Sequence, residues 1–203
     1  MGLVEDTIKA YEFSAKDYVL KHSDISAIEW EAGFFATNLD GNRVLDVGCG
    51  PGRDAKYFSD SGCEVTGIDL VPEFLKIARE KVPKGKFYSM DMRRMGFKDN
   101  YFDGIWSMAS FLHIPRNEAD KTMKEHVRVL KQKGIMFIST LEGDGEDPLP
   151  PSPKYGGYSK FFYGYEENEF KELLKSSGFS IENFDKDVRS EKLIFFNILA
   201  RKK

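Results

Sequence analysis

One short segment constrains the fold of this chain more than any other, because a β-branched run ends in three glycines and leads into a helical pattern. Residues 43–47 read as a buried strand, and Gly48, Gly50 and Gly52 follow directly. Residues 53–61 then place apolar side chains at helical spacing. Glycines at the end of a strand let a ligand approach the bare backbone. The segment therefore predicts a ligand site at the carboxyl edge of a sheet.

The same alternation of strand and helix continues along the chain. Further strands are predicted at residues 64–69, 86–90, 102–107 and 135–140, with helices starting at Pro72 and covering residues 117–131. Residues 179–184 and 193–200 read as two last strands with only a charged turn region between them, so they should pair as an antiparallel hairpin. This order predicts an α/β fold with a Rossmann-like, seven-stranded, mostly parallel sheet and helices on both of its faces.

The remaining segments complete a single domain spanning residues 1–203. Residues 4–39 and 166–177 have helical spacing. Residues 143–157 are rich in glycine, proline and acidic side chains, and they predict an exposed, mobile loop. An aromatic stretch follows at residues 161–165.

The composition sets further limits on function. A formal net charge of -3 over 203 residues gives no electrostatic footprint for nucleic acid. The two cysteines, Cys49 and Cys63, form no disulfide framework and no metal motif, so we expect free thiols, no metal and a reducing compartment. No apolar run is long enough to cross a bilayer and no signal peptide is evident, which predicts a cytoplasmic protein without a membrane partner. No pattern indicates an oligomeric state.

The glycine segment resembles the first motif of the class I S-adenosylmethionine-dependent methyltransferases. The resemblance implies that Asp46 and the turn of Gly48, Cys49, Gly50 and Gly52 hold the amino acid end of S-adenosylmethionine. A nicotinamide fold would instead need G-x-G-x-x-G, whose third glycine would fall on Arg53. An NAD-type oxidoreductase is therefore the alternative enzyme.

Three later segments fit the same resemblance, which covers almost the whole chain from Tyr11 onward. Asp69, followed by Leu70, ends the second strand and could accept both ribose hydroxyls, or it could cap the next helix. The family pattern implies that Asp91 bonds the adenine amino group and that Met92 packs on the ring. Ser107 and Met108 would lie beneath the reactive centre. In this family an N-terminal helix closes over the cofactor, which implies a helical lid at about residues 1–39.

Several side chains are candidates for the acceptor side of such a site. His113 follows the fourth strand and could act as a general base, or it could orient a loop. Tyr11 and Tyr18 could meet the cofactor carboxylate from the lid, or they could simply pack. Four residues beyond the fifth strand could line the acceptor pocket, or the aromatic ones could form a packed cluster: Glu142, Phe162, Tyr163 and Tyr165. His22 and His126 are expected to be structural or exposed.

The expected function is transfer of the S-adenosylmethionine methyl group by in-line displacement to a small-molecule acceptor. Such a step relies on orientation and on exclusion of water, and a base is needed only if the acceptor atom starts protonated. The sequence leaves the acceptor and its atom open. A non-catalytic protein that binds S-adenosylmethionine as a sensor or partner subunit is the second alternative.

Overall fold

A computed structural model describes residues 3–191 and 193–203, and residues 1–2, where the predicted lid begins, lie outside the described part. Seven strands form one sheet in the order β3-β2-β1-β4-β5-β9-β8. They are β1 (Arg43–Val47), β2 (Glu64–Asp69), β3 (Lys86–Ser89), β4 (Phe102–Met108), β5 (Leu130–Leu141), β8 (Phe179–Ser190) and β9 (Leu193–Lys202). The first five run parallel, and β9 pairs antiparallel with both β5 and β8. The predicted fold class is confirmed.

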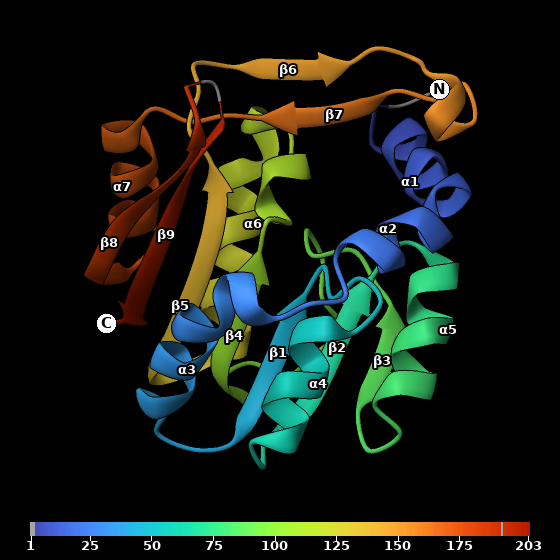
Figure 1. Cartoon of the computed structure of the whole chain (residues 1–203). Coiled ribbons are helices and arrows are strands. Elements are labelled where there is room, and N and C mark those ends of the chain that lie inside the picture. The colour runs from blue at the N-terminus through green and yellow to red at the C-terminus, as the bar shows by residue number, and fades with distance from the viewer. Residues whose placement is uncertain (1–2, 192) are drawn as a thin grey trace.

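Helices cover both faces of this sheet (Figure 1). One face packs against α3 (Glu29–Thr37), α4 (Arg53–Asp60) and α5 (Pro72–Lys81), with Phe35 and Trp106 in its core. The other packs against α6 (Arg116–Val129) and α7 (Glu167–Ser176), with Ile105 and Phe170 in its core. Ile105 and Trp106 are neighbours on β4 that serve opposite layers, as the two-residue period of a strand requires.

The N-terminal helices α1 (Leu3–Phe13) and α2 (Ala15–Lys21) lie above the carboxyl ends of β1 and β2 in Figure 1, and a short turn η1 (Ser26–Ile28) leads on to α3. Ser14 separates α1 from α2, and its hydroxyl donates to the carbonyl of Ala10 at 2.7 Å. The backbone of α1 is close to α5 and to β7 (Lys160–Tyr163). This arrangement places α1 between the sheet edge and the segment that follows β5.

The prediction of a loop over residues 143–157 is wrong in part. The segment contains β6 (Glu146–Leu149), which pairs antiparallel with β7, and the 3-10 turn η3 (Pro153–Tyr155). Pro148 lies in β6 opposite Phe161, and a proline is tolerated there because this two-stranded ribbon has only edge strands. Backbone pairing therefore orders a stretch whose composition indicates a loop.

Two further boundaries differ from the prediction. The strand β8 continues to Ser190, through the charged residues assigned to a turn, because its backbone keeps pairing with β9. The helix α6 ends at Val129 instead of residue 131, and β5 starts at once. Lys133 of β5 has φ of +63°, a left-handed conformation, in the stretch where the register of β5 against β4 shifts between Leu130 and Ile135.

Candidate functional site

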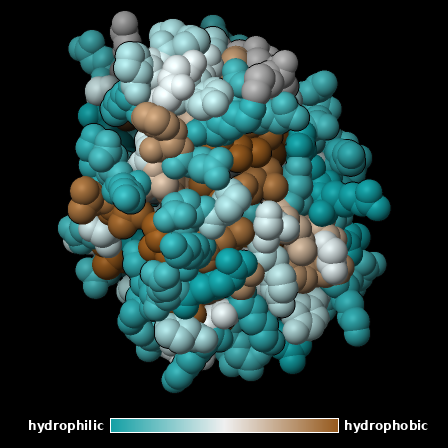
Figure 2. Space-filling view, turned by 90° about the vertical axis from the view of Figure 1, so that its right-hand side faces the viewer, coloured by the Kyte–Doolittle hydropathy of each residue, from teal (hydrophilic) through white to brown (hydrophobic). Residues whose placement is uncertain are grey.

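A cavity opens at the carboxyl edge of β1, β2 and β4, where ligands bind in open α/β sheets. Its empty space is about 850 Å³ when the open mouth is included. Figure 2 shows the face that carries α1, α2 and α5, with apolar side chains in a recess surrounded by hydrophilic ones. The wall combines the glycine turn, the ends of three strands and the inner face of α1.

The glycine turn after β1 has the backbone conformation that only glycine adopts easily. Gly48 has φ of +69°, and a Cβ there would lie 2.3 Å from the Cβ of Ser110. Gly50 has φ of +51°, and a Cβ there would meet no atom within 4 Å. Gly48 therefore allows the loop after β4 to approach, while Gly50 leaves open space beside the backbone for a ligand.

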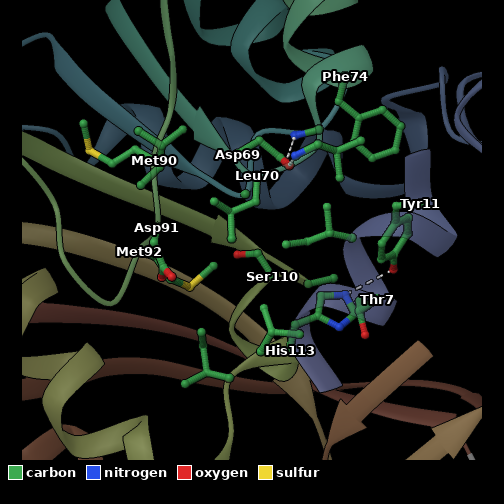
Figure 3. A pocket seen from close by; sticks show the side chains of 18 of the residues that line it. Thr7, Tyr11, Asp69, Leu70, Phe74, Met90, Asp91, Met92, Ser110 and His113 are labelled. Carbon is green, nitrogen blue, oxygen red and sulfur yellow. Dashed lines mark hydrogen bonds between the residues drawn. The ribbon is translucent and has the colours of Figure 1, made fainter. Parts of the chain in front are cut away.

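Asp69 at the end of β2 is the central polar group of the wall. One carboxylate oxygen accepts the Gly50 amide at 2.8 Å and the other accepts the Val71 amide at 2.9 Å (Figure 3). Each oxygen keeps a second acceptor site, so the pair can still receive two hydroxyl groups. Burial raises the pKa of Asp69, and the amides of Val71, Gly50 and Leu70 oppose that rise. The Val71 bond orders the turn before α5 and does not cap the helix, whose N-cap is Val71, so the capping alternative is not borne out.

The end of the cavity beyond β3 holds Met90, Asp91 and Met92, which Figure 3 shows on the side opposite Tyr11 and Phe74. The guanidinium of Arg93 donates to both oxygens of Asp91, and the Arg93 amide donates to Oδ1 at 2.8 Å. These bonds lower the pKa of Asp91 despite its partial burial, which acts in the opposite direction. Since Arg93 already donates to both oxygens of Asp91, this carboxylate has little capacity left to accept the predicted hydrogen bond from an adenine amino group.

The loop after β4 forms the wall opposite Asp69. Met108 lines the cavity, and Ala109 has φ of +49°, a strained conformation for a residue with a side chain. The hydroxyl of Ser110 donates to the carbonyl of Val47 at 2.7 Å, which fastens this loop to β1. Strain at such a position is typical of functional sites.

His113 connects three separate parts of the chain. Its Nδ1 lies 2.8 Å from the carbonyl oxygen of Phe161 in β7, so Nδ1 carries the proton and donates. Its Nε2 then accepts from the Tyr11 hydroxyl of α1 at 3.1 Å (Figure 3). Burial lowers the pKa of His113 to about 4. The imidazole is therefore neutral near pH 7, and its one basic lone pair is already used.

Tyr11 and Tyr18 close the cavity from the N-terminal side. Their rings pack edge to face with centroids 5.6 Å apart, and both contact Phe74 of α5. Burial raises the pKa of each phenol, so both are neutral donors. The Thr7 hydroxyl on the same face of α1 accepts the Phe161 amide at 3.0 Å. The helix α1 is thus bonded to both the β4 loop and β7.

The structure brings most of the predicted site residues to this cavity: Tyr11, Tyr18, Gly48, Gly50, Asp69, Leu70, Asp91, Met92, Met108 and His113. Four others lie outside its wall: Asp46, Cys49, Gly52 and Ser107. The Sγ of Cys49 packs toward Gly67, and Gly52 gives α4 room beside Ala78 of α5. Ser107 is fully buried and bonds to the Ser110 hydroxyl at 2.9 Å. These residues lie behind the residues that line the cavity.

Asp46 is 2% exposed, and its Oδ2 has no hydrogen-bond partner among the described residues. Burial raises its pKa, and the nearby Asp54 carboxylate adds to the rise. An unpartnered buried oxygen is costly unless something bonds it. Asp46 therefore keeps a vacant acceptor site next to the glycine turn.

The four candidates after β5 separate. Phe162 packs on His113 with ring centroids 5.0 Å apart, and Tyr163 borders an open recess beside Asp91 and Arg93. Tyr165 instead packs among Phe111 and Phe170 in the core. Glu142 pairs with Lys186 at 2.7 Å. For Tyr165 the packed cluster, one of the two alternatives, is therefore the one observed, and Glu142 does not line the cavities described for this site.

Sequence reasoning missed several lining residues, among them Thr7, Phe74, Arg93 and Ser110. Arg93 carried a usable signal, since an arginine two residues after an aspartate can fold back on it. Thr7 and Ser110 carried none, because their partners are distant in the sequence. His126 is completely buried and its Nδ1 bonds to the Thr122 carbonyl, which confirms the structural one of its two predicted roles.

Within residues 3–191 and 193–203, no group of three or more His, Cys, Asp or Glu side chains is placed to hold a metal ion. None of the helices in this part of the chain has the length and apolar character needed to cross a membrane. Both cysteines are free thiols.

Comparison with known proteins agrees with the fold and site. A methyltransferase-domain family matches residues 45–138. A 2-methyl-6-phytyl-1,4-hydroquinone methyltransferase from Synechocystis is 35% identical over 142 residues, which are 67% of this chain and 43% of that protein. The chain thus spans less than half the length of this relative.

Solved structures match over more of the chain. A SAM-dependent methyltransferase from Methanosarcina mazei has a TM-score of 0.75 at 22% identity, covering 83% of this chain and 96% of that one. The 1,6-didemethyltoxoflavin-N1-methyltransferase of Burkholderia thailandensis, solved with its substrate and S-adenosylhomocysteine, has a TM-score of 0.71 at 23% identity, covering 94% and 88%.

Fold and site together define a Rossmann-like nucleotide-binding domain of the methyltransferase type. Within residues 45–138 and over the stretch shared with the Synechocystis relative, the chain is similar to the class I S-adenosylmethionine-dependent methyltransferases, whose methyl donor is S-adenosylmethionine. The matches give no support to the NAD-type oxidoreductase considered as an alternative.

Proposed function

We propose that this protein transfers the methyl group of S-adenosylmethionine to a small-molecule acceptor. The observation that carries the proposal is Asp69, whose two oxygens bond backbone amides on one side and keep free acceptor sites toward the cavity. Two vicinal ribose hydroxyls suit this carboxylate. The open space beside Gly50 gives the ligand access to the glycine turn.

The lining residues divide naturally among the parts of the cofactor. Gly48 and Gly50 would hold its amino acid end, with Asp46 as a vacant acceptor nearby. Met90 and Met92 would pack on the adenine. Met108 would lie near the reactive centre. The cofactor supplies an electrophilic methyl group on a sulfonium, and the chain supplies orientation and exclusion of water.

We also propose that α1 and α2 are the lid of a single-domain enzyme. The bonds of Tyr11 to His113 and of Thr7 to Phe161 hold this lid closed. His113 serves here as a positioning residue, because its pKa of about 4 and its occupied Nε2 make it a poor base near neutral pH. Acceptors that lose no proton, or lose it to solvent, fit this arrangement best.

Three observations support a small acceptor. The cavity is roofed by α1, which excludes a polymer strand from it. The net charge of -3 gives no attraction for nucleic acid. The relatives from Synechocystis and Burkholderia thailandensis are named for ring compounds of low mass. Free thiols at Cys49 and Cys63 favour a reducing compartment, for which we propose the cytoplasm.

A thermal-shift titration with S-adenosylmethionine, S-adenosylhomocysteine and NAD in parallel tests the proposal. Ligand at a hundred times its dissociation constant should stabilise the protein by about 2.7 kcal/mol, visible as a higher melting temperature. A rise with both adenosyl ligands and none with NAD supports the assignment, and a rise with NAD alone contradicts it. Release of S-adenosylhomocysteine with a screened acceptor then excludes a sensor or partner subunit.

A further inference from the structure

A second cavity lies on the other side of Tyr11 and Tyr18. It encloses about 560 Å³ including its open mouth, between α2, η3 and the ribbon of β6 and β7. Tyr11 and Tyr18 line both cavities, so their rings form the partition between them. Phe162 lines the second cavity and packs on His113, which lines the first. The two spaces are therefore separated by a single layer of side chains.

Lys160 is the distinctive residue of the second cavity. It is only 6% exposed, and its ammonium lies 3.6 Å from the centre of the Tyr11 ring and 4.3 Å from that of Tyr155. Among the described side chains, no carboxylate lies within ion-pair distance of it. Burial, with the nearby charge of Lys154, lowers its pKa to about 8. A buried cation without a counter-charge is costly, and aromatic faces repay only part of that cost.

The other charged groups of this cavity are also mostly cationic. Lys21 and Lys154 line it, and Asp17 is the one acidic side chain among the described lining residues. The cavity therefore carries a local positive charge in a chain whose net charge is -3. Leu149, Tyr155 and Phe162 add apolar surface. Cationic, aromatic and apolar groups together suit a small organic acid.

We propose that the second cavity binds the carboxylate of a small aromatic acid, which pairs with the ammonium of Lys160. The acid ring packs against Tyr155 and Phe162, and its far end points toward the partition at Tyr11. The acid binds beside the proposed cofactor cavity, and Tyr11 and Tyr18 separate it from that cavity. Lys160 then acts in binding of the acid, and its buried charge is neutralised only when the acid is present.

The test compares benzoate and 4-hydroxybenzoate with the neutral amides of the same shape, titrated by calorimetry into the full chain at pH 7. We expect each acid to bind at least tenfold more tightly than its amide. Lys160→Met should abolish that preference, and Lys160→Arg should retain part of it. Lys124→Met removes an equal charge from an exposed residue paired with Asp120, and it should change nothing. Circular dichroism on each variant confirms that it is folded.

Equal affinity for acids and amides in the wild type would overturn the inference, as would an undiminished preference in Lys160→Met. A titration with S-adenosylhomocysteine on the same samples separates this result from the proposed function. Binding of S-adenosylhomocysteine without acid preference removes only the second site. Acid preference without binding of S-adenosylhomocysteine removes the methyltransferase proposal and leaves an anion site at Lys160.

Discussion

Two regions of the site are built in different ways. The cofactor edge consists of the glycine turn after β1 and the end of β2, and the cover consists of α1, the loop after β4 and β7. At the edge, the decisive bond joins Gly50 and Asp69, which are 19 residues apart within one strand-helix-strand unit. In the cover, the bonds of Tyr11 to His113 and Thr7 to Phe161 span 102 and 154 residues. A local unit has the same geometry wherever the motif occurs, whereas the cover exists only when distant segments meet. We therefore expect the edge to govern cofactor binding and the cover to govern the acceptor.

The largest effect is expected at the edge, from Asp69→Ala. The variant loses two hydrogen bonds from ribose hydroxyls to a charged acceptor, and binding of S-adenosylhomocysteine should weaken by about 3 kcal/mol, or roughly 100-fold. Calorimetric titration measures this loss. Asp60→Ala is the control, because its carboxylate is an exposed partner of Lys56. Unchanged affinity in Asp69→Ala would falsify the ribose assignment.

The second effect separates two glycines of the same turn. Gly48→Ala places a Cβ 2.3 Å from that of Ser110 at φ of +69°, and should cost at least about 2 kcal/mol of unfolding free energy. In Gly50→Ala the new Cβ meets no atom within 4 Å, so the unfolding free energy should fall by only about 1 kcal/mol, because of the left-handed backbone. Urea denaturation compares them. Equal losses would mean that the approach of Ser110 is not what requires Gly48.

The same contrast explains what the sequence could predict. The strands from β1 to β5, their helices and the cavity position of Asp69 follow from local patterns, because periodicity and glycine spacing act over short range. The β6–β7 ribbon was missed since its order comes from backbone pairing across residues such as Pro148. The position of Tyr165 stayed open between pocket and core, because aromatic character alone does not distinguish a core ring from a pocket ring. The hydrogen bonds from the Arg93 guanidinium to Asp91 could not be predicted with certainty from the sequence, because they depend on the side-chain geometry.

A third prediction concerns the pH dependence of the cover. The pKa of His113 is about 4 in the folded chain against an ordinary value of 6.5, so the unfolded chain binds more protons between these values. Stability is therefore complete above about pH 6.5 and falls as the pH drops toward 4. One such proton gives a slope of at most about 1.4 kcal/mol per pH unit. His113→Gln should flatten the curve from urea denaturation at pH 5, 6 and 7.5.

His22 and His126 also have pKa values lowered by burial, and they contribute to the slope in both proteins. Only the difference between wild type and His113→Gln reports on His113. Parallel curves would show that His113 is already solvated or charged in the folded chain, and the proposed role of the Tyr11–His113 bond in holding the lid closed would lose its basis.

The smallest effect should come from Tyr11→Phe, which keeps the ring and removes the hydroxyl that donates to His113. Loss of one hydrogen bond should lower the unfolding free energy by about 1 kcal/mol. Because the bond joins the lid to the β4 loop, hydrogen exchange should quicken in the α1 amides and not in those of β1 or β2. Tyr88→Phe, on an exposed tyrosine of β3, is the matched control.

The affinity of Tyr11→Phe for S-adenosylhomocysteine should change less than twofold, since Asp69 and the glycine turn are untouched. That outcome would separate the two regions, with the lid loosened while the cofactor edge still binds. A large loss of cofactor affinity would instead mean that the Tyr11 hydroxyl reaches the cofactor itself, as the family resemblance implies. The edge and the cover would then both bind the cofactor, although one is formed by a local segment and the other by distant segments of the chain.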